Sequence, residues 1–171
     1  MKNTNHSLFD KYEMIKDLGT GSSGSVTLVR HISMDQERAL KKVPKASAFA
    51  ESALSEARLL KSLEHPSIPR IFDFEEDDAF YYIVEEYIDG ETLDSFLLHQ
   101  QLISPGLFFN ICEQLCNVFI YLHTQISTPI IYRDLKPEHI IVCHNKLKLI
   151  DFGVSAYVIQ DGNNFNHYGN I

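Results

Sequence analysis

The chain has 171 residues, of which 44% are hydrophobic and 22% charged, and its formal net charge is -8. This composition is typical of a soluble globular protein and argues against disorder along the whole chain. The lysines and arginines are scattered along an acidic sequence, which argues against binding of nucleic acid or anionic lipid through a basic face.

The first half of the sequence predicts five strands and one helix. Short β-like runs alternate with turn signals, as in a strand meander. Apolar residues recur at helical spacing from about Ser47 to Leu63, and the pair His65-Pro66 ends this pattern. The predicted strands cover residues 12–18, 26–32, 38–43, 71–74 and 80–84.

The second half is predicted to be mainly helical, beyond a polar break at Asp89-Gly90 that marks the expected domain boundary. The expected elements are helices at 92–99 and 104–123 and strands at 140–143 and 147–150. Ser104 is the N-cap candidate of the long helix, and Pro105 occupies its first position. This helix is apolar most of the way round, so it should lie inside a larger lobe. After Gly153 we expect polar, irregular chain.

Targeting signals and cysteines favour a cytoplasmic protein. Residues 1–10 hold no apolar segment of a secretory signal, and no stretch approaches the roughly 20 apolar residues of a membrane helix. The three cysteines, Cys112, Cys116 and Cys143, cannot all pair within the chain. We expect buried free thiols in a reducing compartment, with a metal or redox role as the alternative.

A glycine-rich run lies between the first two predicted strands. Gly19, Gly21 and Gly24 let backbone N–H groups approach phosphate oxygens because no Cβ stands in the way. Glycines of an ordinary hairpin turn are the alternative interpretation. The strand-to-strand context argues against a Rossmann site, in which a helix follows at once.

Lys41 lies in the third predicted strand, where it could neutralise phosphate oxygens of a nucleotide or simply face solvent. A helical wheel at about 100° per residue puts Glu56 in the middle of the apolar face of the first helix. A carboxylate in that position is costly unless it is paired. We therefore predict an ion pair between Lys41 and Glu56, with a glutamate that reaches solvent at the helix edge as the alternative.

Two acidic motifs near the end of the chain carry the chemistry of phosphoryl transfer. Asp134, in the run Arg133-Asp134-Leu135-Lys136-Pro137, can accept the proton of an attacking hydroxyl. Lys136 can offset charge on the transferred phosphoryl group. Asp151, in Asp151-Phe152-Gly153, supplies a hard oxygen ligand for Mg²⁺.

In order and spacing these elements resemble the protein-kinase family, including a hinge at 86–88 between the strands and the long helix. The resemblance covers residues 10–155, and Lys136 is similar to the serine/threonine branch. It implies an α+β, protein-kinase-like fold. The expected parts are a tail (1–9), an ATP-binding N-lobe with a five-stranded antiparallel sheet and one helix (10–88), and a partial, mainly helical C-lobe (89–171).

The resemblance also implies the cofactors and the site. ATP and Mg²⁺, or Mn²⁺ in its place, would serve transfer of phosphate to a protein serine or threonine. The implied catalytic residues are Asp134, Lys136, Lys41 and Glu56. The implied nucleotide contacts are Gly19, Thr20, Gly21, Gly24, Val26, Ala39, Lys41, Glu86, Ile88 and Ile141. The implied metal ligands are Asp151 and, as an atypical ligand, His139.

Three positions depart from the family pattern. His139 replaces the asparagine that binds a second Mg²⁺, and imidazole nitrogen suits softer ions such as Mn²⁺ or Zn²⁺. Reduced activity or a shifted metal preference is therefore our hypothesis. Tyr132 replaces a histidine, as in bacterial members of the family, and should support the Asp-Phe-Gly segment. Glu85 stands at the back of the adenine pocket, where it should narrow or polarise access.

Eighteen residues follow Gly153, without the Ala-Pro-Glu motif and the helices that complete a kinase lobe. We expect a truncated kinase, a fragment, or part of a longer protein, whose helix at 104–123 exposes an apolar surface that a partner could cover. Arg133 suggests control by phosphorylation of the activation segment. The candidate hydroxyls are Ser155, Tyr157 and Tyr168.

Three functions compete on these observations. The first is an active protein serine/threonine kinase. The second is a nucleotide-binding pseudokinase or interaction module, which His139 and the short chain favour. The third is a small-molecule kinase of the antibiotic phosphotransferase kind, which usually lacks the full glycine loop and the Arg-Asp-Leu-Lys-Pro run.

Overall fold

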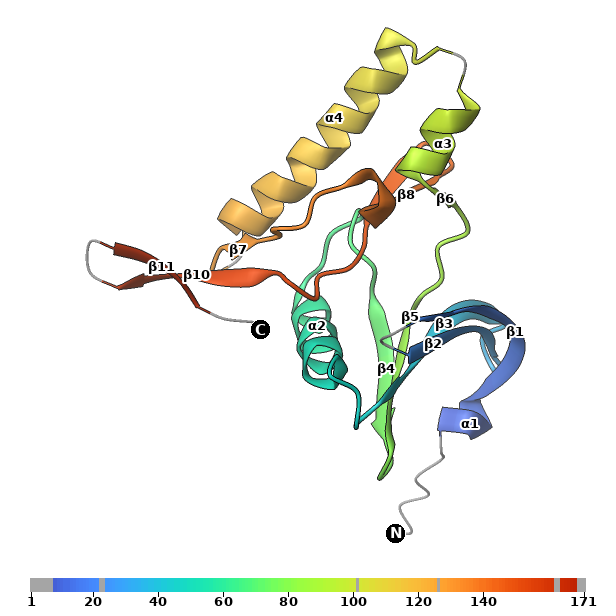
Figure 1. The fold of residues 1–171 in the computed structure, drawn as a ribbon. Coiled ribbons are helices and arrows are strands. Elements are labelled where there is room, and N and C mark those ends of the chain that lie inside the picture. The colour runs from blue at the N-terminus through green and yellow to red at the C-terminus, as the bar shows by residue number, and fades with distance from the viewer. Residues whose placement is uncertain (1–7, 22–23, 101, 126, 162–163, 169–171) are drawn as a thin grey trace. The chain divides into compact units, whose positions relative to one another are not determined.

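The computed structural model describes residues 8–21, 24–100, 102–125, 127–161 and 164–168 (Figure 1). The chain divides into two compact units. The first unit consists of Met1–Ala57 and Arg70–Tyr87, and the second of Arg58–Pro69 and Ile88–Ile171. The division falls within the helix α2 (Ala50–Ser62), so the end of this helix and the segment after it belong with the second unit.

The first unit is built on a five-stranded antiparallel sheet with the strand order β1-β2-β3-β5-β4. Its elements are α1 (Leu8–Lys11), β1 (Tyr12–Gly21), β2 (Gly24–His31), β3 (Gln36–Pro44), β4 (Ile71–Glu76), β5 (Phe80–Glu86) and the start of α2 (Ala50–Ser62). The predicted five-stranded antiparallel sheet with its helix is thus confirmed.

Both faces of this sheet are covered. On one face Leu40 and Val84 pack with Leu8, the first residue of α1, which the sequence did not predict. On the other face Val43 and Ile83 pack against alanines of α2. Because side chains alternate along a strand, Lys41 lies on the face that α2 covers.

The start of α2 differs from the prediction. The helical pattern was expected to begin at about Ser47, but Phe49 is 46% exposed and precedes the first helical residue, Ala50. The reason is a local turn, in which the N–H of Phe49 donates to Oγ of Ser47 at 3.2 Å. Such side-chain to backbone bonds compete with helix formation. Ala53 and Ala57 are the residues of α2 that pack against Val43 and Ile83 of the sheet.

Within the described residues, the second unit contains two three-stranded sheets, ordered β6-β8-β9 and β11-β10-β7. Its elements are β6 (Glu91–Thr92), α3 (Leu93–His99), α4 (Pro105–Ile120), a π-helical turn (Tyr121–Gln125), β7 (Ile130–Ile131), a 3₁₀ turn (Pro137–His139), β8 (Ile140–Cys143), β9 (Lys146–Leu149), β10 (Ala156–Asp161) and β11 (Asn164–Tyr168). Between β8 and β9, His144 and Asn145 both have positive φ, as a two-residue type I′ hairpin requires.

The helix α4 begins where the sequence predicted. Oγ of Ser104 accepts a hydrogen bond from the N–H of Leu107 at 3.2 Å, and Pro105 is the first helical residue. The apolar helix is only partly covered, since Phe108 is 54% and Phe109 68% exposed while Val118 is buried. The expected exposed apolar surface is therefore present in this unit.

Two expectations were wrong. The chain after Gly153 was expected to be irregular, but it forms the hairpin β10–β11, because Ala156 pairs with Ile131 of β7. Local sequence patterns do not report such a long-range pairing. The cysteines were expected to be buried, but Cys116 is exposed, and all three thiols are free.

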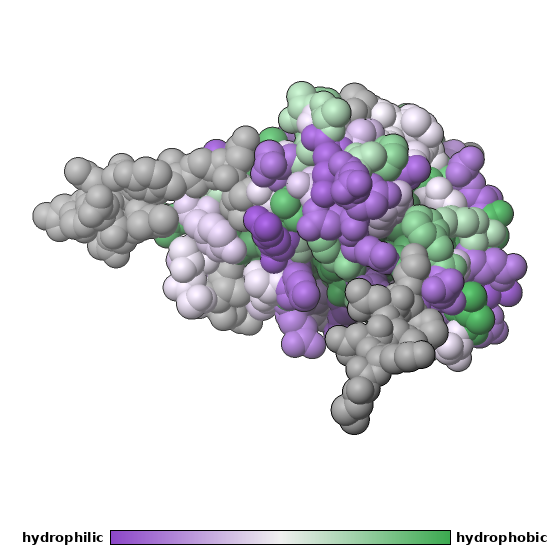
Figure 2. All heavy atoms as spheres, turned by 90° about the horizontal axis from the view of Figure 1, so that it is seen from below, coloured by the Kyte–Doolittle hydropathy of each residue, from purple (hydrophilic) through white to green (hydrophobic). Residues whose placement is uncertain are grey.

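No helix among the described residues is both long and apolar enough to cross a membrane. On the face drawn in Figure 2, apolar side chains are interspersed with hydrophilic ones.

Candidate active site

The glycine loop joins β1 to β2, and its three glycines differ in what the fold requires of them. Gly24 has φ +141°, and a Cβ there would lie 2.1 Å from the carbonyl oxygen of Lys42. At Gly19 and Gly21 a Cβ would meet no atom within 4 Å. Of these three positions, only position 24 therefore requires glycine for packing and backbone conformation. The glycines at 19 and 21 leave an open backbone that a ligand can approach.

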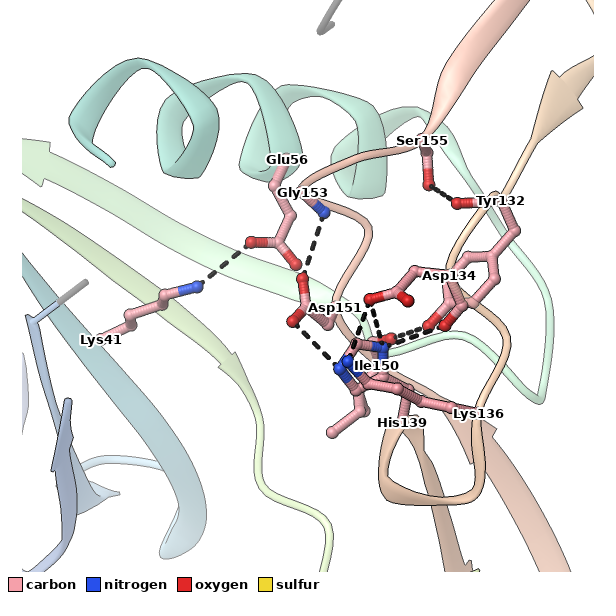
Figure 3. Close-up of polar contacts among 10 residues, drawn as sticks. All are labelled: Lys41, Glu56, Tyr132, Asp134, Lys136, His139, Ile150, Asp151, Gly153 and Ser155. Carbon is pink, nitrogen blue, oxygen red and sulfur yellow. Dashed lines mark hydrogen bonds and ion pairs between the residues drawn. The ribbon is translucent and has the colours of Figure 1, made fainter. Parts of the chain in front are cut away.

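The ion pair predicted between β3 and α2 is confirmed. Nζ of Lys41 lies 3.1 Å from Oε2 of Glu56, and the two side chains are 22% and 12% exposed (Figure 3). Partial shielding from water strengthens such a pair relative to one on the surface. Glu56 thus holds the lysine ammonium group at a defined place beside β3.

Glu85 adds a second carboxylate to this face of the sheet. It lies opposite Ala39 of β3, whereas Lys41 lies opposite Ile83, so Glu85 is the diagonal neighbour of Lys41. Burial raises the pKa of the Glu85 carboxyl, the positive charge of Lys41 lowers it, and the negative charge of Glu56 raises it, with a net pKa of about 7. Both members of the Lys41–Glu56 ion pair therefore influence the charge of Glu85.

The segment between β7 and the 3₁₀ turn, residues 132–136, brings Asp134 and Lys136 together. Nζ of Lys136 lies 3.1 Å from Oδ2 of Asp134, and both side chains are more than 40% exposed. Arg133, just before them, has φ 71°, in a region of backbone space that non-glycine residues occupy mainly at turns and functional sites. The carboxylate of Asp134 is thus accessible to a hydroxyl group from solvent.

The imidazole of His139 connects the carboxylates of Asp134 and Asp151, which the sequence did not predict. Its Nδ1 lies 3.3 Å from Oδ2 of Asp134 and 3.1 Å from the carbonyl oxygen of that residue. Its Nε2 lies 3.3 Å from Oδ2 of Asp151 (Figure 3). The side chain is only 11% exposed. Two backbone bonds fix the residue, from its own N–H to Lys136 and from the N–H of Ile150 to its carbonyl.

Asp151 is presented by a turn at the end of β9. Its φ is 60°, and its Oδ1 accepts a hydrogen bond from the N–H of Gly153 at 3.3 Å. Within the described ranges, no three acidic, histidine or cysteine side chains gather as a metal site. Mg²⁺ in nucleotide sites is typically held by one or two carboxylates together with phosphates and water. The carboxylate of Asp151 is therefore compatible with a Mg²⁺ ion that arrives with a nucleotide, whereas the imidazole of His139 suits this ion less well.

Tyr132 supports the segment that carries Asp151, as predicted. Its hydroxyl donates a hydrogen bond to the carbonyl oxygen of Ile150. Its ring meets that of Phe152 edge to face, with centroids 5.1 Å apart, and both rings are buried. Aromatic pairs of this geometry stabilise beyond the area that they bury.

The candidate phosphorylation sites differ in access. Ser155 is buried, and its hydroxyl donates to the carbonyl oxygen of Tyr132 at 3.3 Å. Tyr157 is half-buried, and the side chain of Tyr168 lies outside the described part. Nε of Arg133 donates to the carbonyl oxygen of Val154. This arrangement makes Ser155 a poor phosphate acceptor in the folded chain.

Comparison with known proteins agrees with this geometry. The protein kinase domain family matches residues 12–169. The chain belongs to the protein kinase family. It is 32% identical over 151 residues to serine/threonine-protein kinase PrkC of Bacillus subtilis, an alignment that covers 85% of this chain and 23% of that kinase.

Two eukaryotic kinases are similarly close. Serine/threonine-protein kinase ppk25 of Schizosaccharomyces pombe is 34% identical over 85% of this chain and 35% of its own length. The cAMP-dependent protein kinase type 3 of Saccharomyces cerevisiae is 35% identical over 90% of this chain and 39% of its own length. The chain thus spans less than two fifths of each of these relatives.

The residues expected at a kinase nucleotide site are divided between the two units. The first unit carries Gly19, Thr20, Gly21, Gly24, Val26, Ala39, Lys41 and Glu86. The second unit carries Ile88 and Ile141, the latter in β8. Val26 lies directly opposite Lys41 on the neighbouring strand. Their roles toward a nucleotide remain predictions.

Sequence reasoning missed two features of the kinase site. It interpreted His139 only as the replacement of an asparagine, and it did not predict that the ring reaches both Asp134 and Asp151. It also treated Glu85 as an obstacle in a pocket and did not relate it to Lys41. Glu85 directly follows the strand predicted at 80–84, and Lys41 lies in the strand predicted at 38–43, but only the structure shows that these two strands are neighbours.

Proposed function

We propose that this chain binds ATP with a divalent metal ion and transfers the γ-phosphoryl group to a serine or threonine hydroxyl of a protein. The observation that carries the proposal is the exposed carboxylate of Asp134, which has the Lys136 ammonium group 3.1 Å away and is linked through His139 to Asp151. A base, a cation and a metal ligand within one short stretch are what phosphoryl transfer needs.

The first unit would hold the nucleotide. The open backbone at Gly19 and Gly21 suits approach of phosphate oxygens. Lys41, oriented by Glu56, would neutralise charge on the α and β phosphates. Ala39 and Val26 on β3 and β2 would contribute apolar contacts to adenine.

The second unit would carry the chemistry. The substrate hydroxyl oxygen attacks the γ phosphorus, its proton passes to the carboxylate of Asp134, and the bond from phosphorus to the bridging oxygen breaks to release ADP. Lys136 would offset negative charge on the transferred group. When bound, Mg²⁺ supplies positive charge to the phosphate oxygens. Asp151 is the residue that would hold it, with His139 as an atypical second ligand.

Nucleotide binding is tested by the melting temperature of the purified chain with and without ATP, in Mg²⁺ and in Mn²⁺. A ligand that binds only the folded state raises this temperature. We expect a metal-dependent rise in wild type that is lost in Lys41→Ala. Asp134→Asn is the matched control, because it should keep the rise but lose transfer of labelled phosphate. A cooperative transition that ATP never shifts would contradict nucleotide binding.

A nucleotide-binding pseudokinase is the second candidate, and a specific observation favours it. Both ring nitrogens of His139 face carboxylates. As a histidine, this residue also has no amide oxygen of the kind that usually binds the second metal ion in the family. Autophosphorylation and transfer to a serine- and threonine-containing protein would separate the two candidates. Binding of ATP without transfer above that of Asp134→Asn would support the pseudokinase.

A cytoplasmic location is part of the proposal. Cys112, Cys116 and Cys143 are unpaired in the described chain, which suits a reducing compartment. Fractionation of the native host, followed by detection of the protein with an antibody, would test this location.

A further inference from the structure

Glu85 lies on the face of the first unit that also carries the Lys41–Glu56 ion pair. Along β5 it is two residues beyond Ile83, the residue directly opposite Lys41. Residues in such diagonal positions of an antiparallel pair are about 7–8 Å apart at the backbone, within reach of long side chains. The register therefore places a second carboxylate beside the same ammonium group.

The surroundings leave Glu85 few other charged neighbours. The residues opposite it are apolar, namely Ala39 on β3 and Ile71 on β4. The covering helix α2 contributes Glu56, and β3 contributes Lys41, and these are the two charged groups of the described chain that act on the carboxyl group. Glu56 makes the ion pair with Lys41, and the charges of both residues act on Glu85.

This arrangement is costly when both carboxylates are charged. One ammonium group cannot fully compensate two nearby negative charges in a site shielded from water. Accordingly, burial and Glu56 together raise the pKa of Glu85 to about 7, despite the opposing effect of Lys41. A glutamate of this kind changes charge within the physiological pH range.

We propose that Glu85 is a positioning residue for the nucleotide site, whose charged carboxylate competes with Glu56 for Lys41 and so weakens nucleotide binding. The inference rests on the proposed function, because it concerns the lysine that would contact the phosphates. A charged Glu85 draws the Lys41 ammonium group away and adds a negative charge near anionic phosphates. A neutral Glu85 does neither.

The sign of the pH effect follows from this chemistry. Below about pH 7 Glu85 is mostly protonated, so Lys41 stays with Glu56 and is available to the phosphates. Above about pH 7 Glu85 is charged and competes. Nucleotide affinity should therefore fall as the pH rises through 7, by up to about tenfold for one unpaired charge in a shielded site.

The experiment measures the Kd of Mg-ADP for the full chain at about pH 6, 7 and 8, in wild type and in Glu85→Gln. The isosteric amide keeps the volume and removes the titration. We expect the Kd of wild type to rise between about pH 6 and 8 by roughly 3- to 10-fold more than that of Glu85→Gln. Glu51→Gln, an exposed glutamate of α2, is the matched control and should follow wild type.

The possible outcomes separate this inference from the proposed function. Parallel pH profiles of wild type and Glu85→Gln would overturn the inference while leaving nucleotide binding intact. Absence of ADP binding in every form would overturn the proposed function. In that case urea unfolding of Glu56→Gln, Glu85→Gln and the double variant would test the competition itself. Non-additive effects would support competition for Lys41, and additive effects would exclude it.

Discussion

Nζ of Lys41 lies 3.1 Å from Oε2 of Glu56, so one ion pair joins the third strand to α2. We predict that Glu56→Gln lowers kcat/KM for ATP by about 10- to 100-fold, because a displaced lysine no longer meets the phosphates. Steady-state kinetics at varied ATP concentration would measure this change. Glu51→Gln on the same helix should have no effect, and an equally small effect of both substitutions would contradict the role of the pair.

Substitution of two glycines in the loop should separate an effect on stability from an effect on ATP binding. Gly24→Ala should lower the free energy of unfolding by at least about 2 kcal/mol, because φ is +141° and the added Cβ would collide with the carbonyl of Lys42. Gly21→Ala has open space around it, so it should change stability by less than about 0.5 kcal/mol. It should nevertheless weaken ATP binding. Urea unfolding and ATP titration of both variants would test this contrast, which fails if Gly21→Ala binds ATP like wild type.

His139→Asn should restore the ligand set that is usual in the family. We expect the Mg²⁺-dependent transfer rate to rise by about tenfold, the equivalent of roughly 1.4 kcal/mol, while the rate in Mn²⁺ changes less. The reason is that an amide oxygen suits Mg²⁺ better than imidazole nitrogen does. Transfer assays in each metal would measure the change. Equal Mg²⁺ rates in the two proteins would exclude a catalytic cost of His139.

Asp77 should make the β4–β5 turn sensitive to acid. Its Oδ1 accepts hydrogen bonds from the N–H groups of Ala79 and Phe80, and these bonds, with one from the hydroxyl of Tyr82, lower its pKa. A carboxyl group with a lowered folded-state pKa contributes stability above its unfolded-state pKa. This stability is lost as the pH falls through the folded-state pKa.

The comparison of wild type with Asp77→Asn tests this dependence. Wild type should be the more stable protein at neutral pH, and the difference should shrink as the pH is lowered toward about 3, since the carboxyl group is then protonated. Urea unfolding across this range would measure it. Asp78→Asn, the exposed neighbour, is the control, and a difference that does not depend on pH would contradict the prediction.

Local signals in the sequence were sufficient for most helices and strands. Ser104 and Pro105 predicted the start of α4, since an N-cap and a first-turn proline act within a few residues. The position of Glu56 on the apolar face of a helix predicted its ion pair, because an unpaired carboxylate there would be too costly. The motifs around Asp134 and Asp151 identified the family for a similar reason, since their chemistry depends on short, fixed spacings.

The tertiary structure decided what depends on residues far apart in the chain. The pairing of Ala156 with Ile131 made a hairpin of a segment that looked irregular, and the strand register set Glu85 diagonal to Lys41. The contact of His139 with both Asp134 and Asp151 likewise needed the fold of the catalytic loop. The sequence by itself determined which chemical groups the site contains. Their mutual distances were decided by long-range pairing, which local periodicity does not encode.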